Sequence, residues 1–460
     1  MSKVHHLASS LVIILCIGVI SSTKYTPDWA SLDTRPLPAW FDEGKIGIML
    51  HVGVFSVPSF GSEWFWDEWK ANVPSYVNFM KHNYPPEFTY PDFAPKFTFE
   101  FFNPDEWAKF LSDAGAKYVI LTTKHHEGFT NWPSKFSFNW NSMDVGPKRD
   151  IVGELAAAVR KRGDVHFGVY HSLYEWFNPL YLEDKANHYK SQNFIKEKLM
   201  PEMYELVNNY KPEIFWSDGD WDAKDVYWNS TEFVAWLYNE SPVKDTVIVN
   251  DRWGNNTRCI HGGYWNCKDR YNPRVLLKHK WENIMTMDKK AGAYRREATL
   301  RDYYTMEELI ENLVSTVSCG GNLLINVGIT HDGRVIPVFE ERLMKMRKWL
   351  DVNGEAIYST KPWTHQNDTL TPGVWYTSKE TVNGTVVYAI VLDWPKINLL
   401  LLGAPDMAND TTVSMVGYPG ELKWVPGTIS GVVVEIPPIP YGKLPCQYAW
   451  VFKFTNLKKW

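Results

Sequence analysis

The segment Trp216-Ser217-Asp218-Gly219-Asp220-Trp221 follows an apolar run and places two carboxylates where a buried strand would end. In a parallel (β/α) barrel, side chains that end the strands at the C-terminal face point into the active-site mouth. Tryptophan faces are common platforms for sugars, and paired carboxylates are the usual means of cleaving glycosidic bonds. The segment therefore predicts a catalytic carboxylate on a barrel strand. The alternative is a loop whose two Asp residues face water.

Strand and helix patterns alternate around this segment, from Trp40 to about Gly354. Capping residues support the helices, because Asp150 precedes one helical pattern and Thr305 with Glu308 forms a capping box for another. Repeated βα units predict an α/β fold with a (β/α)8-like TIM barrel. A doubly wound sheet is the alternative, but no glycine-rich phosphate loop follows the first strand. The predicted strands are 45–51, 118–123, 165–171, 214–218, 246–250 and 323–327.

A different pattern begins after about Lys361, with short alternating strands separated by turn residues such as Asn383-Gly384. Strands are expected at 386–394, 412–416, 432–436 and 448–454, which predicts a C-terminal antiparallel β-sandwich. The expected organisation is a signal peptide at 1–22, a catalytic barrel at 23–360 and the β-sandwich at 361–460.

The N-terminus predicts entry into the secretory pathway, and so a secreted or lysosomal protein. Leu7 to Ile20 form a mostly apolar run of 14 residues after Lys3, too short to span a bilayer comfortably. Cleavage is expected near Ser21 or Ser22. Asn239 is a doubtful glycosylation acceptor because Pro242 follows its sequon. The Asn-x-Ser/Thr sequons are at Asn229, Asn239, Asn255, Asn367, Asn383 and Asn409.

Charge and cysteine content exclude some partners. The 48 basic and 53 acidic residues give a net charge of −5 without a basic run, so nucleic acid is not an expected partner. Removal of the signal peptide leaves Cys259, Cys267, Cys319 and Cys446, which allow three pairings. The short Cys259–Cys267 loop is the most economical one. Neither a metal nor a cofactor is expected, since the cysteines and histidines are not clustered as zinc ligands usually are.

Histidines end several of the predicted strands: His51, His125, His126 and His171. Neutral imidazoles both donate and accept hydrogen bonds, which suits sugar hydroxyls, and a zinc site is the competing interpretation. Glu63 and Trp64 lie on the loop after the first strand. Arg252 ends the 246–250 strand region, where a guanidinium can hold hydroxyls or lower the pKa of a carboxylate.

Four segments resemble one enzyme family, the retaining α-L-fucosidases, especially the animal tissue type. They are Lys-His-His-Glu-Gly-Phe at 124–129, Trp-Ser-Asp-Gly-Asp-Trp at 216–221, Asn-Asp-Arg-Trp at 250–253 and His-Gly-Gly-Tyr at 261–264. The resemblance implies Asp218 as nucleophile, fucosylated glycans as substrates and a homo-oligomer without a membrane span. It also implies a set of fucose-binding residues: His51, Glu63, Trp64, His125, His126, His171, Trp216 and Arg252.

The sequence departs from this family at Val52, where tryptophan is usual, at Ile284, which replaces the cysteine of the signature at 273–284, and at Ile329, which replaces a common proline. The general acid/base has two candidates. Asp269 lies on a loop and Glu282 lies within the signature; a mobile loop residue more easily meets the about 5–5.5 Å separation that a retaining mechanism needs, so Asp269 is favoured.

Two functional hypotheses follow. The first is a retaining exo-glycosidase that removes terminal α-L-fucose from glycoproteins, glycolipids or oligosaccharides through a fucosyl-enzyme intermediate. The second is a secreted lectin-like protein that binds fucose with lost or weak turnover. Release of nitrophenol from 4-nitrophenyl fucoside separates the two.

Overall fold

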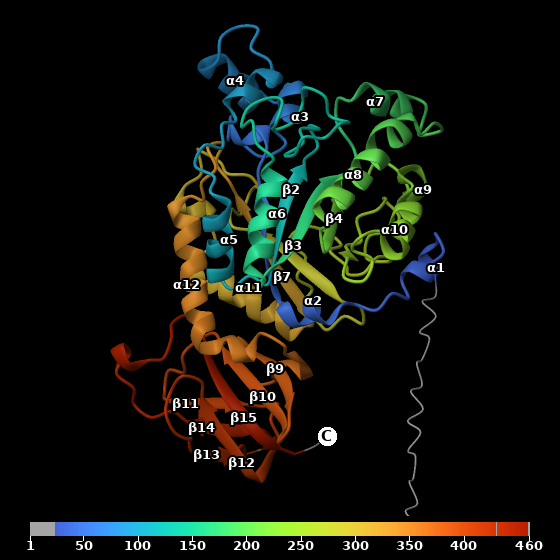
Figure 1. Ribbon diagram of the computed structural model, residues 1–460. Coiled ribbons are helices and arrows are strands. Elements are labelled where there is room, and N and C mark those ends of the chain that lie inside the picture. Colours follow the sequence, from blue (N-terminus) through green and yellow to red (C-terminus); the bar gives the residue numbers. More distant parts are fainter. Residues whose placement is uncertain (1–23, 429, 459–460) are drawn as a thin grey trace, which may run out of the picture.

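The computed structural model describes residues 24–428 and 430–458, so the predicted signal peptide lies outside the described residues. A curled parallel sheet surrounded by helices forms the larger part, and antiparallel sheets form the C-terminal part (Figure 1). The C-terminal sheets lie at the end of the barrel opposite to the loops that carry α3 (Phe65–Lys70), α4 (Pro74–Asn83) and α7 (Pro179–Ala186).

The parallel sheet has seven strands in the order β5-β4-β3-β2-β1-β7-β6. Their burial is almost complete, as expected for parallel strands covered on both faces. The strands are β1 (Ile46–His51), β2 (Tyr118–Lys124), β3 (His166–Ser172), β4 (Ile214–Asp218), β5 (Ile248–Val249), β6 (Trp281–Thr286) and β7 (Gly321–Gly328).

An irregular segment closes the barrel between β5 and β6. The amide of Gly263 donates to the carbonyl of Val249 over 3.1 Å, and Trp265 exchanges backbone hydrogen bonds with Lys280 and Glu282 at 2.9 and 2.8 Å. Residues 263–265 therefore take the place of the eighth strand of the barrel, although they form only an isolated β-bridge, between Trp265 and Trp281.

Alternate side chains along each strand face the inside and outside of the barrel, following the period of two. Met49, Tyr170, Trp216 and Ile284 belong to one buried cluster, which fills the interior. The neighbours of these residues in sequence, such as Phe215, pack outward against the helices in a separate and much larger cluster. The inward parity also applies to Asp218, two residues after Trp216.

Helices cover the outside of the sheet, and their ends follow the predicted signals. Asp150 accepts the amide of Gly153 at the start of α6 (Ile151–Arg162), and Gly163 ends that helix in the left-handed conformation. Thr305 and Glu308 form the capping box of α11 (Met306–Ser318). The remaining helices among the described residues are α1 (Trp29–Leu32), α2 (Ala39–Gly44), α5 (Pro104–Asp113), α8 (Met200–Tyr210), α9 (Asp225–Trp228), α10 (Ser230–Asn239) and α12 (Pro337–Asn353).

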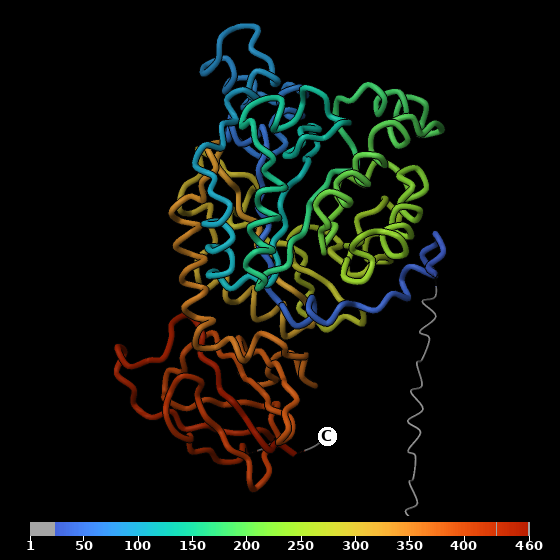
Figure 2. Tube along the Cα trace, in the orientation of Figure 1, coloured from blue at the N-terminus to red at the C-terminus, as the bar shows by residue number. Residues whose placement is uncertain are grey.

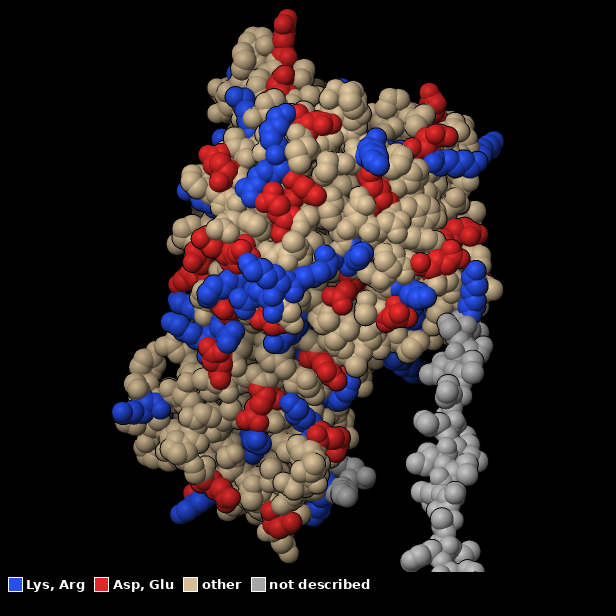
Figure 3. All heavy atoms as spheres, in the orientation of Figure 1, with Lys and Arg blue, Asp and Glu red and all other residues tan. Residues whose placement is uncertain are grey.

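The N-terminal segment runs from α1 to α2 along the base of the barrel (Figure 2). It is fixed by polar contacts, because Trp29 donates to Asp225 over 2.8 Å and the side-chain amide of Asn239 binds the backbone N–H and C=O of Tyr25. On the face in Figure 3, Lys and Arg are interspersed with Asp and Glu.

The C-terminal part contains a five-stranded sheet, β12-β15-β10-β9-β8, and a three-stranded sheet, β11-β14-β13. Their inner faces share one apolar cluster, which includes Tyr376, Val413, Val434 and Phe452. Trp349 of α12 donates to the carbonyl of Ala449 over 2.9 Å and so ties this part to the barrel. The strands are β8 (Lys361–Asn367), β9 (Val374–Thr381), β10 (Gly384–Val391), β11 (Leu399–Leu402), β12 (Met407–Met415), β13 (Trp424–Pro426), β14 (Val432–Glu435) and β15 (Trp450–Leu457).

The predicted fold class, a TIM-like barrel followed by antiparallel sheets, is confirmed. Individual strands differ from the prediction. The 281–286 strand was not expected, because Glu282 and Asn283 interrupt its apolar pattern, and β5 is shorter than the predicted 246–250. In the C-terminal part, β8, β9, β11 and β13 were not expected.

Candidate active site

A hollow of about 450 Å³ opens at the C-terminal ends of the barrel strands. Strands β1, β3, β4, β6 and β7 each contribute at least one side chain to its wall, and the two histidines that follow β2 contribute as well. The predicted residues that line it are His51, Glu63, Trp64, His125, His126, Trp216, Asp218, Arg252, Asp269 and Ile284.

Asp218 ends β4 on the inward face, and its carboxylate has four neighbours, one of which is His126 with Nε2 at 3.8 Å from Oδ2. Tyr170 donates to Oδ2 over 2.7 Å, Nη1 of Arg252 donates to Oδ1 over 3.0 Å, and Nη2 of Arg258 lies 3.7 Å from Oδ1. Burial alone would raise the pKa of Asp218, but the two guanidinium groups and the Tyr170 hydroxyl together hold it below its usual value. Asp218 is therefore an ionised carboxylate at neutral pH.

The turn after Asp218 requires glycine. Gly219 has a φ of 72°, and a Cβ there would lie 2.3 Å from the ring of Tyr174. Any other residue would be strained and would displace that ring. This turn redirects the chain immediately after Asp218.

Arg252 joins the two candidate catalytic carboxylates. Its Nη1 binds Asp218, and its Nη2 donates to Oδ1 of Asp269 over 2.5 Å. Two oxygens bound to one guanidinium lie close together, which is compatible with the about 5–5.5 Å of a retaining carboxylate pair. The two acids differ in exposure, because the Asp218 side chain is 11% exposed and that of Asp269 is 63% exposed.

Arg258 is held by Asp220, the second acid of the 216–221 segment. Asp220 is fully buried and receives both Nε and Nη2 of Arg258. Asp220 does not line the hollow, whereas Arg258 does. Asp220 therefore holds the Arg258 guanidinium beside Asp218, and its own carboxylate does not face water.

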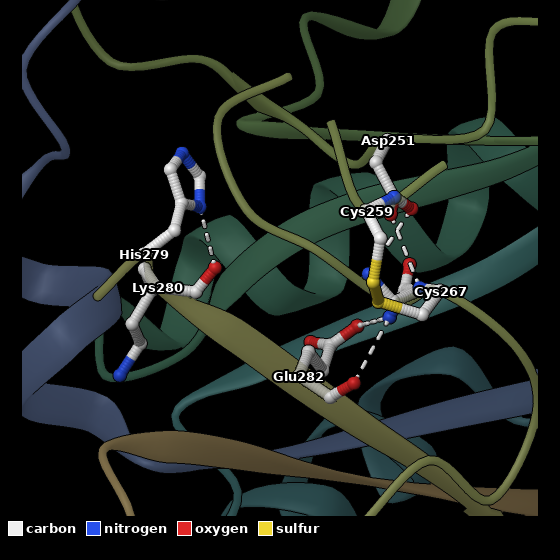
Figure 4. The surroundings of a disulfide bond; sticks show 7 residues. Asp251, Cys259, Cys267, His279, Lys280 and Glu282 are labelled. Atoms are coloured by element: carbon white, nitrogen blue, oxygen red, sulfur yellow. Dashed lines mark hydrogen bonds between the residues drawn. A yellow bond between two sulfur atoms is a disulfide. The ribbon is translucent and has the colours of Figure 1, made fainter. Parts of the chain in front are cut away.

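A disulfide between Cys259 and Cys267 stabilises the loop that carries these groups (Figure 4). The carboxylate of Asp251 accepts the backbone N–H groups of Cys259 and Cys267 at 2.8 and 3.1 Å, and that of Asn266 at 3.0 Å. We call Asp251 and the disulfide the hub of this loop. Arg252 follows Asp251, Arg258 precedes Cys259, and Asp269 lies two residues after Cys267. The hub therefore fixes the backbone next to three side chains of the site.

Asp251, Cys259 and Cys267 are the only group of three or more potential metal-ligating side chains that lie close together among the described residues. Its two sulfurs are bonded to each other and are therefore not thiolate ligands. Cys319 and Cys446 are free.

Each of the three histidines that line the hollow has a polar side chain next to its Nδ1 atom, which fixes the orientation of the ring. His51 Nδ1 lies 3.4 Å from Thr122 Oγ1, His125 Nδ1 lies 3.2 Å from Glu127 Oε2, and His126 Nδ1 lies 2.7 Å from Ser172 Oγ. Burial, reinforced by His125, lowers the pKa of His51 to about 4 and that of His126 well below its usual value. Both rings are thus neutral at pH 7. Nε2 of His51 is buried without a hydrogen-bond partner among the described residues.

Glu63 and Trp64 form the part of the wall next to His126, whose ring centroid lies 5.4 Å from that of Trp64. Glu63 accepts the backbone N–H groups of Gly292 and Ala293 at 3.1 and 3.0 Å, and Trp64 stacks on Trp221 with ring centroids 5.8 Å apart. The two indoles provide an apolar surface beside Asp218.

His171, which was expected among the fucose-binding residues, does not line the hollow. It follows the inward-facing Tyr170 and therefore points out of the barrel. Its Nε2 lies 3.5 Å from Glu202, within a buried cluster that contains Lys124 and Lys198. Burial, and then Lys124, lowers the pKa of His171 to about 4.

Glu282 also lies outside the hollow, deep in the barrel at the start of β6. It accepts hydrogen bonds from Tyr118 at 2.6 Å, Trp216 at 3.0 Å and Asn266 at 3.1 Å. Burial raises its pKa in spite of these donors. Glu282 fixes the indole of Trp216, over which the Arg252 guanidinium lies 4.5 Å from the ring centroid.

The structure adds site residues that the sequence reasoning missed, chiefly Tyr170, Trp221 and Arg258. The sequence gives no clear signal for Tyr170, because the β3 segment lacks a regular alternating pattern that would show which of its side chains face inward. Of the three family departures, Ile284 lines the hollow, whereas Val52 and Ile329 are fully buried and do not line it.

The potential glycosylation sites differ in accessibility. Asn255, Asn367, Asn383 and Asn409 are exposed, and Asn229 is half-buried. Asn239 uses its side-chain amide to bind Tyr25. None of the helices in the described part of the chain is both long and apolar enough to cross a membrane.

Comparisons with known proteins agree with this geometry. A family model described as Alpha-L-fucosidase matches residues 13–355, and one described as Alpha-L-fucosidase C-terminal domain matches residues 366–455. An alpha-L-fucosidase of Branchiostoma floridae is 60% identical over 449 residues, covering 97% of this chain and 99% of the relative. The tissue alpha-L-fucosidase of Homo sapiens is 54% identical over 456 residues, covering 97% of each chain.

A solved structure is similar over nearly the whole chain. The Thermotoga maritima alpha-fucosidase in complex with fucose has a TM-score of 0.80 and 30% identity, covering 94% of this chain and 100% of that chain. The chain is thus similar to α-L-fucosidases over nearly its whole length. Its barrel also carries a carboxylate at a strand end that an arginine joins to a carboxylate on a loop. This chain belongs to the α-L-fucosidase family of glycoside hydrolases.

Proposed function

We propose that this enzyme removes terminal α-L-fucose from glycoconjugates by double displacement, with Asp218 as nucleophile and Asp269 as general acid/base. The observation that carries the assignment is the shared guanidinium of Arg252, which binds both carboxylates in one hollow. A pair of closely spaced carboxylates is what a retaining glycosidase requires and what a lectin does not need.

Asp218 has the properties of the nucleophile. Its pKa is held below the usual value, so the attacking carboxylate is ionised, and Tyr170 orients it. The carboxylate attacks the anomeric carbon, the glycosidic C–O bond breaks, and a fucosyl ester forms on Asp218. Water then attacks the anomeric carbon and releases Asp218.

Asp269 has the properties of the acid/base. It lies at the open side of the hollow, where a leaving sugar and then water can reach it. It gives its proton to the leaving oxygen in the first step and takes one from water in the second. Glu282 is sealed behind Trp216 and has no access to either oxygen, so we assign it a positioning role.

The neutral histidines and the indoles recognise the sugar. Nε2 of His51 is a buried polar atom without a hydrogen-bond partner among the described residues, and His125 and His126 have their Nδ1 atoms occupied, so that Nε2 of each ring can bind a hydroxyl. The Trp64 and Trp221 rings suit the apolar face of a deoxy sugar.

The deciding experiment compares Asp269→Ala with Glu282→Ala on 4-nitrophenyl fucoside and on a natural fucosyl disaccharide. Only the disaccharide has a poor leaving group that needs protonation, so Asp269→Ala should reduce its hydrolysis far more than that of the nitrophenyl substrate. Azide should restore turnover of the nitrophenyl substrate in the Asp269 variant. A selective loss in Glu282→Ala, absent from Asp269→Ala, would exchange the two roles.

The processing and location of the chain are part of the proposal. We infer a signal peptide at 1–22, a catalytic barrel at 23–360, a C-terminal domain at 361–460, and a lysosomal or secreted glycoprotein that forms homo-oligomers. The expected glycans are on Asn255, Asn367, Asn383 and Asn409, because these side chains are exposed, and not on Asn239. Intact mass before and after deglycosylation, N-terminal sequencing and light scattering test these points.

A further inference from the structure

The wall around Asp269 carries an excess of positive charge. Five Lys and Arg side chains line the hollow, against three Asp and Glu side chains: Arg252, Arg258, Lys268, Arg270 and Lys290 against Glu63, Asp218 and Asp269. Most of the cations have a carboxylate partner. Arg252 binds Asp218 and Asp269, Arg258 binds Asp220, and Lys290 binds Asp302.

Lys268 and Arg270 are different. Within residues 24–428 and 430–458, neither has a carboxylate at ion-pair distance. Arg270 contacts only neutral oxygens, the Thr286 hydroxyl at 2.7 Å and the Asp288 carbonyl at 3.4 Å. Both residues are exposed, and both line the hollow.

The positions of these two cations are fixed relative to the site. They flank Asp269 in the chain, and their segment is anchored at both ends, because the amide of Cys267 binds Asp251 and that of Arg270 donates to the carbonyl of Ile284 over 2.8 Å. The group that protonates the leaving oxygen must lie next to the leaving sugar. Lys268 and Arg270 therefore lie on the side of the hollow where the leaving group would be.

We propose that the leaving-group side of this pocket selects fucosylated glycans that bear an anionic substituent, a sulfate ester or a carboxylate, on the sugar that carries the fucose. This inference rests on the proposed function of Asp269. An ammonium and a guanidinium without counter-ions in a cavity wall attract an anion and lose little by binding it, since no existing ion pair must break.

The test uses pairs of α-L-fucosyl disaccharides that differ only by one sulfate ester on the leaving sugar, and a third whose leaving sugar is a uronic acid. We expect the wild type to have a higher kcat/KM for both anionic substrates than for the neutral one. Lys268→Gln should lower this ratio by about threefold to fivefold, mainly through KM, as expected for one solvent-accessible charge contact. Lys268→Arg should retain the ratio.

Arg270→Gln should act in the same direction. The matched control is Lys109→Gln, an exposed lysine of α5 that pairs with Asp113 away from the hollow. High salt should bring the wild-type ratio towards that of Lys268→Gln, because an exposed charge contact is screened. A wild-type ratio at or below one, or a ratio that neither Lys268→Gln nor salt changes, would overturn the inference. A failure of the proposed function can be told apart from a failure of this inference, because in the first case the wild type would release no nitrophenol from 4-nitrophenyl fucoside.

Discussion

The hydroxyl of Tyr170 donates a 2.7 Å hydrogen bond to Oδ2 of Asp218, from the neighbouring strand of the barrel. This contact orients the proposed nucleophile and helps to keep its pKa low. Hydrogen bonds to charged groups are worth about 1.5–3 kcal/mol, so Tyr170→Phe should lower kcat/KM about 10- to 100-fold.

The pH profile distinguishes this role from a purely steric one. Loss of the hydroxyl removes a group that favours the carboxylate, so the pKa of Asp218 rises and the acid limb of the kcat/KM profile moves to higher pH. An unchanged acid limb in Tyr170→Phe would mean that the hydroxyl does not influence the nucleophile.

Asp218→Ala should remain folded and lose on the order of 10⁴-fold or more of its activity on 4-nitrophenyl fucoside, because the covalent route is removed. Added azide should restore part of the release by occupying the space of the missing carboxylate. Circular dichroism provides the folding control. Full activity of this variant would end the assignment and direct attention to Asp220.

His126→Ala and His171→Ala form a matched pair, because both histidines are buried and only His126 lines the hollow. His126→Ala should raise KM by an amount that corresponds to about 1–3 kcal/mol, since a sugar hydroxyl loses its partner. His171→Ala should instead lower the melting temperature, because Glu202 loses a buried contact. A KM effect in His171→Ala at unchanged stability would return this residue to the binding set.

Glu282→Gln should change how stability depends on pH. The pKa of Glu282 is raised above its usual 4.5 by burial, so its unfolded form ionises at a lower pH than its folded form. Wild-type stability from this group is fully present below about pH 4.5 and is lost as the pH rises through the folded pKa. The amide of Gln cannot ionise, and the variant should lack this loss.

Urea unfolding of both proteins between about pH 4.5 and about pH 7 measures this difference. The unfolding free energy of the wild type should fall relative to that of Glu282→Gln as the pH increases. A constant difference would show that Glu282 ionises alike in both states.

Removal of the disulfide by Cys259→Ala with Cys267→Ala should lower the unfolding free energy by about 2–3 kcal/mol, the value for a short closed loop. Hydrolysis of a fucosyl disaccharide should fall more than that of 4-nitrophenyl fucoside, because Asp269 loses its placement next to Cys267. Cys446→Ala, which alters a free cysteine, is the control. Equal losses on both substrates would exclude a specific effect on the acid/base.

Much of the site could be predicted because it follows strand ends. Asp218, His51 and the His125-His126 pair end or follow strands whose apolar patterns are clear, and parallel topology brings their ends together. His171 lies one position away from a residue that lines the hollow, since strand parity turns Tyr170 inward and His171 outward. Parity requires the phase of the strand, which Ile214, Trp216 and Asp218 reveal for β4 and no equally regular pattern reveals for β3.

The remainder depends on contacts between residues distant in sequence. That Arg252 joins Asp218 to Asp269, or that Glu282 is sealed behind Trp216, follows from how residues 251–280 fold over the barrel. This segment has little regular structure, so its sequence carries no periodic signal for the position of Asp269.

Residues 263–265, which close the barrel, divide the site into two groups of residues. The two groups differ in how well the surrounding fold tolerates substitutions. The nucleophile and the histidines stand on β1 to β4, where a shift of one strand would disturb the whole interior. Asp269, Lys268 and Arg270 belong to the long connection across the closure, which is held at a few anchor points. We therefore expect substitutions between Cys267 and Trp281 to change contacts with the leaving sugar more than contacts with fucose.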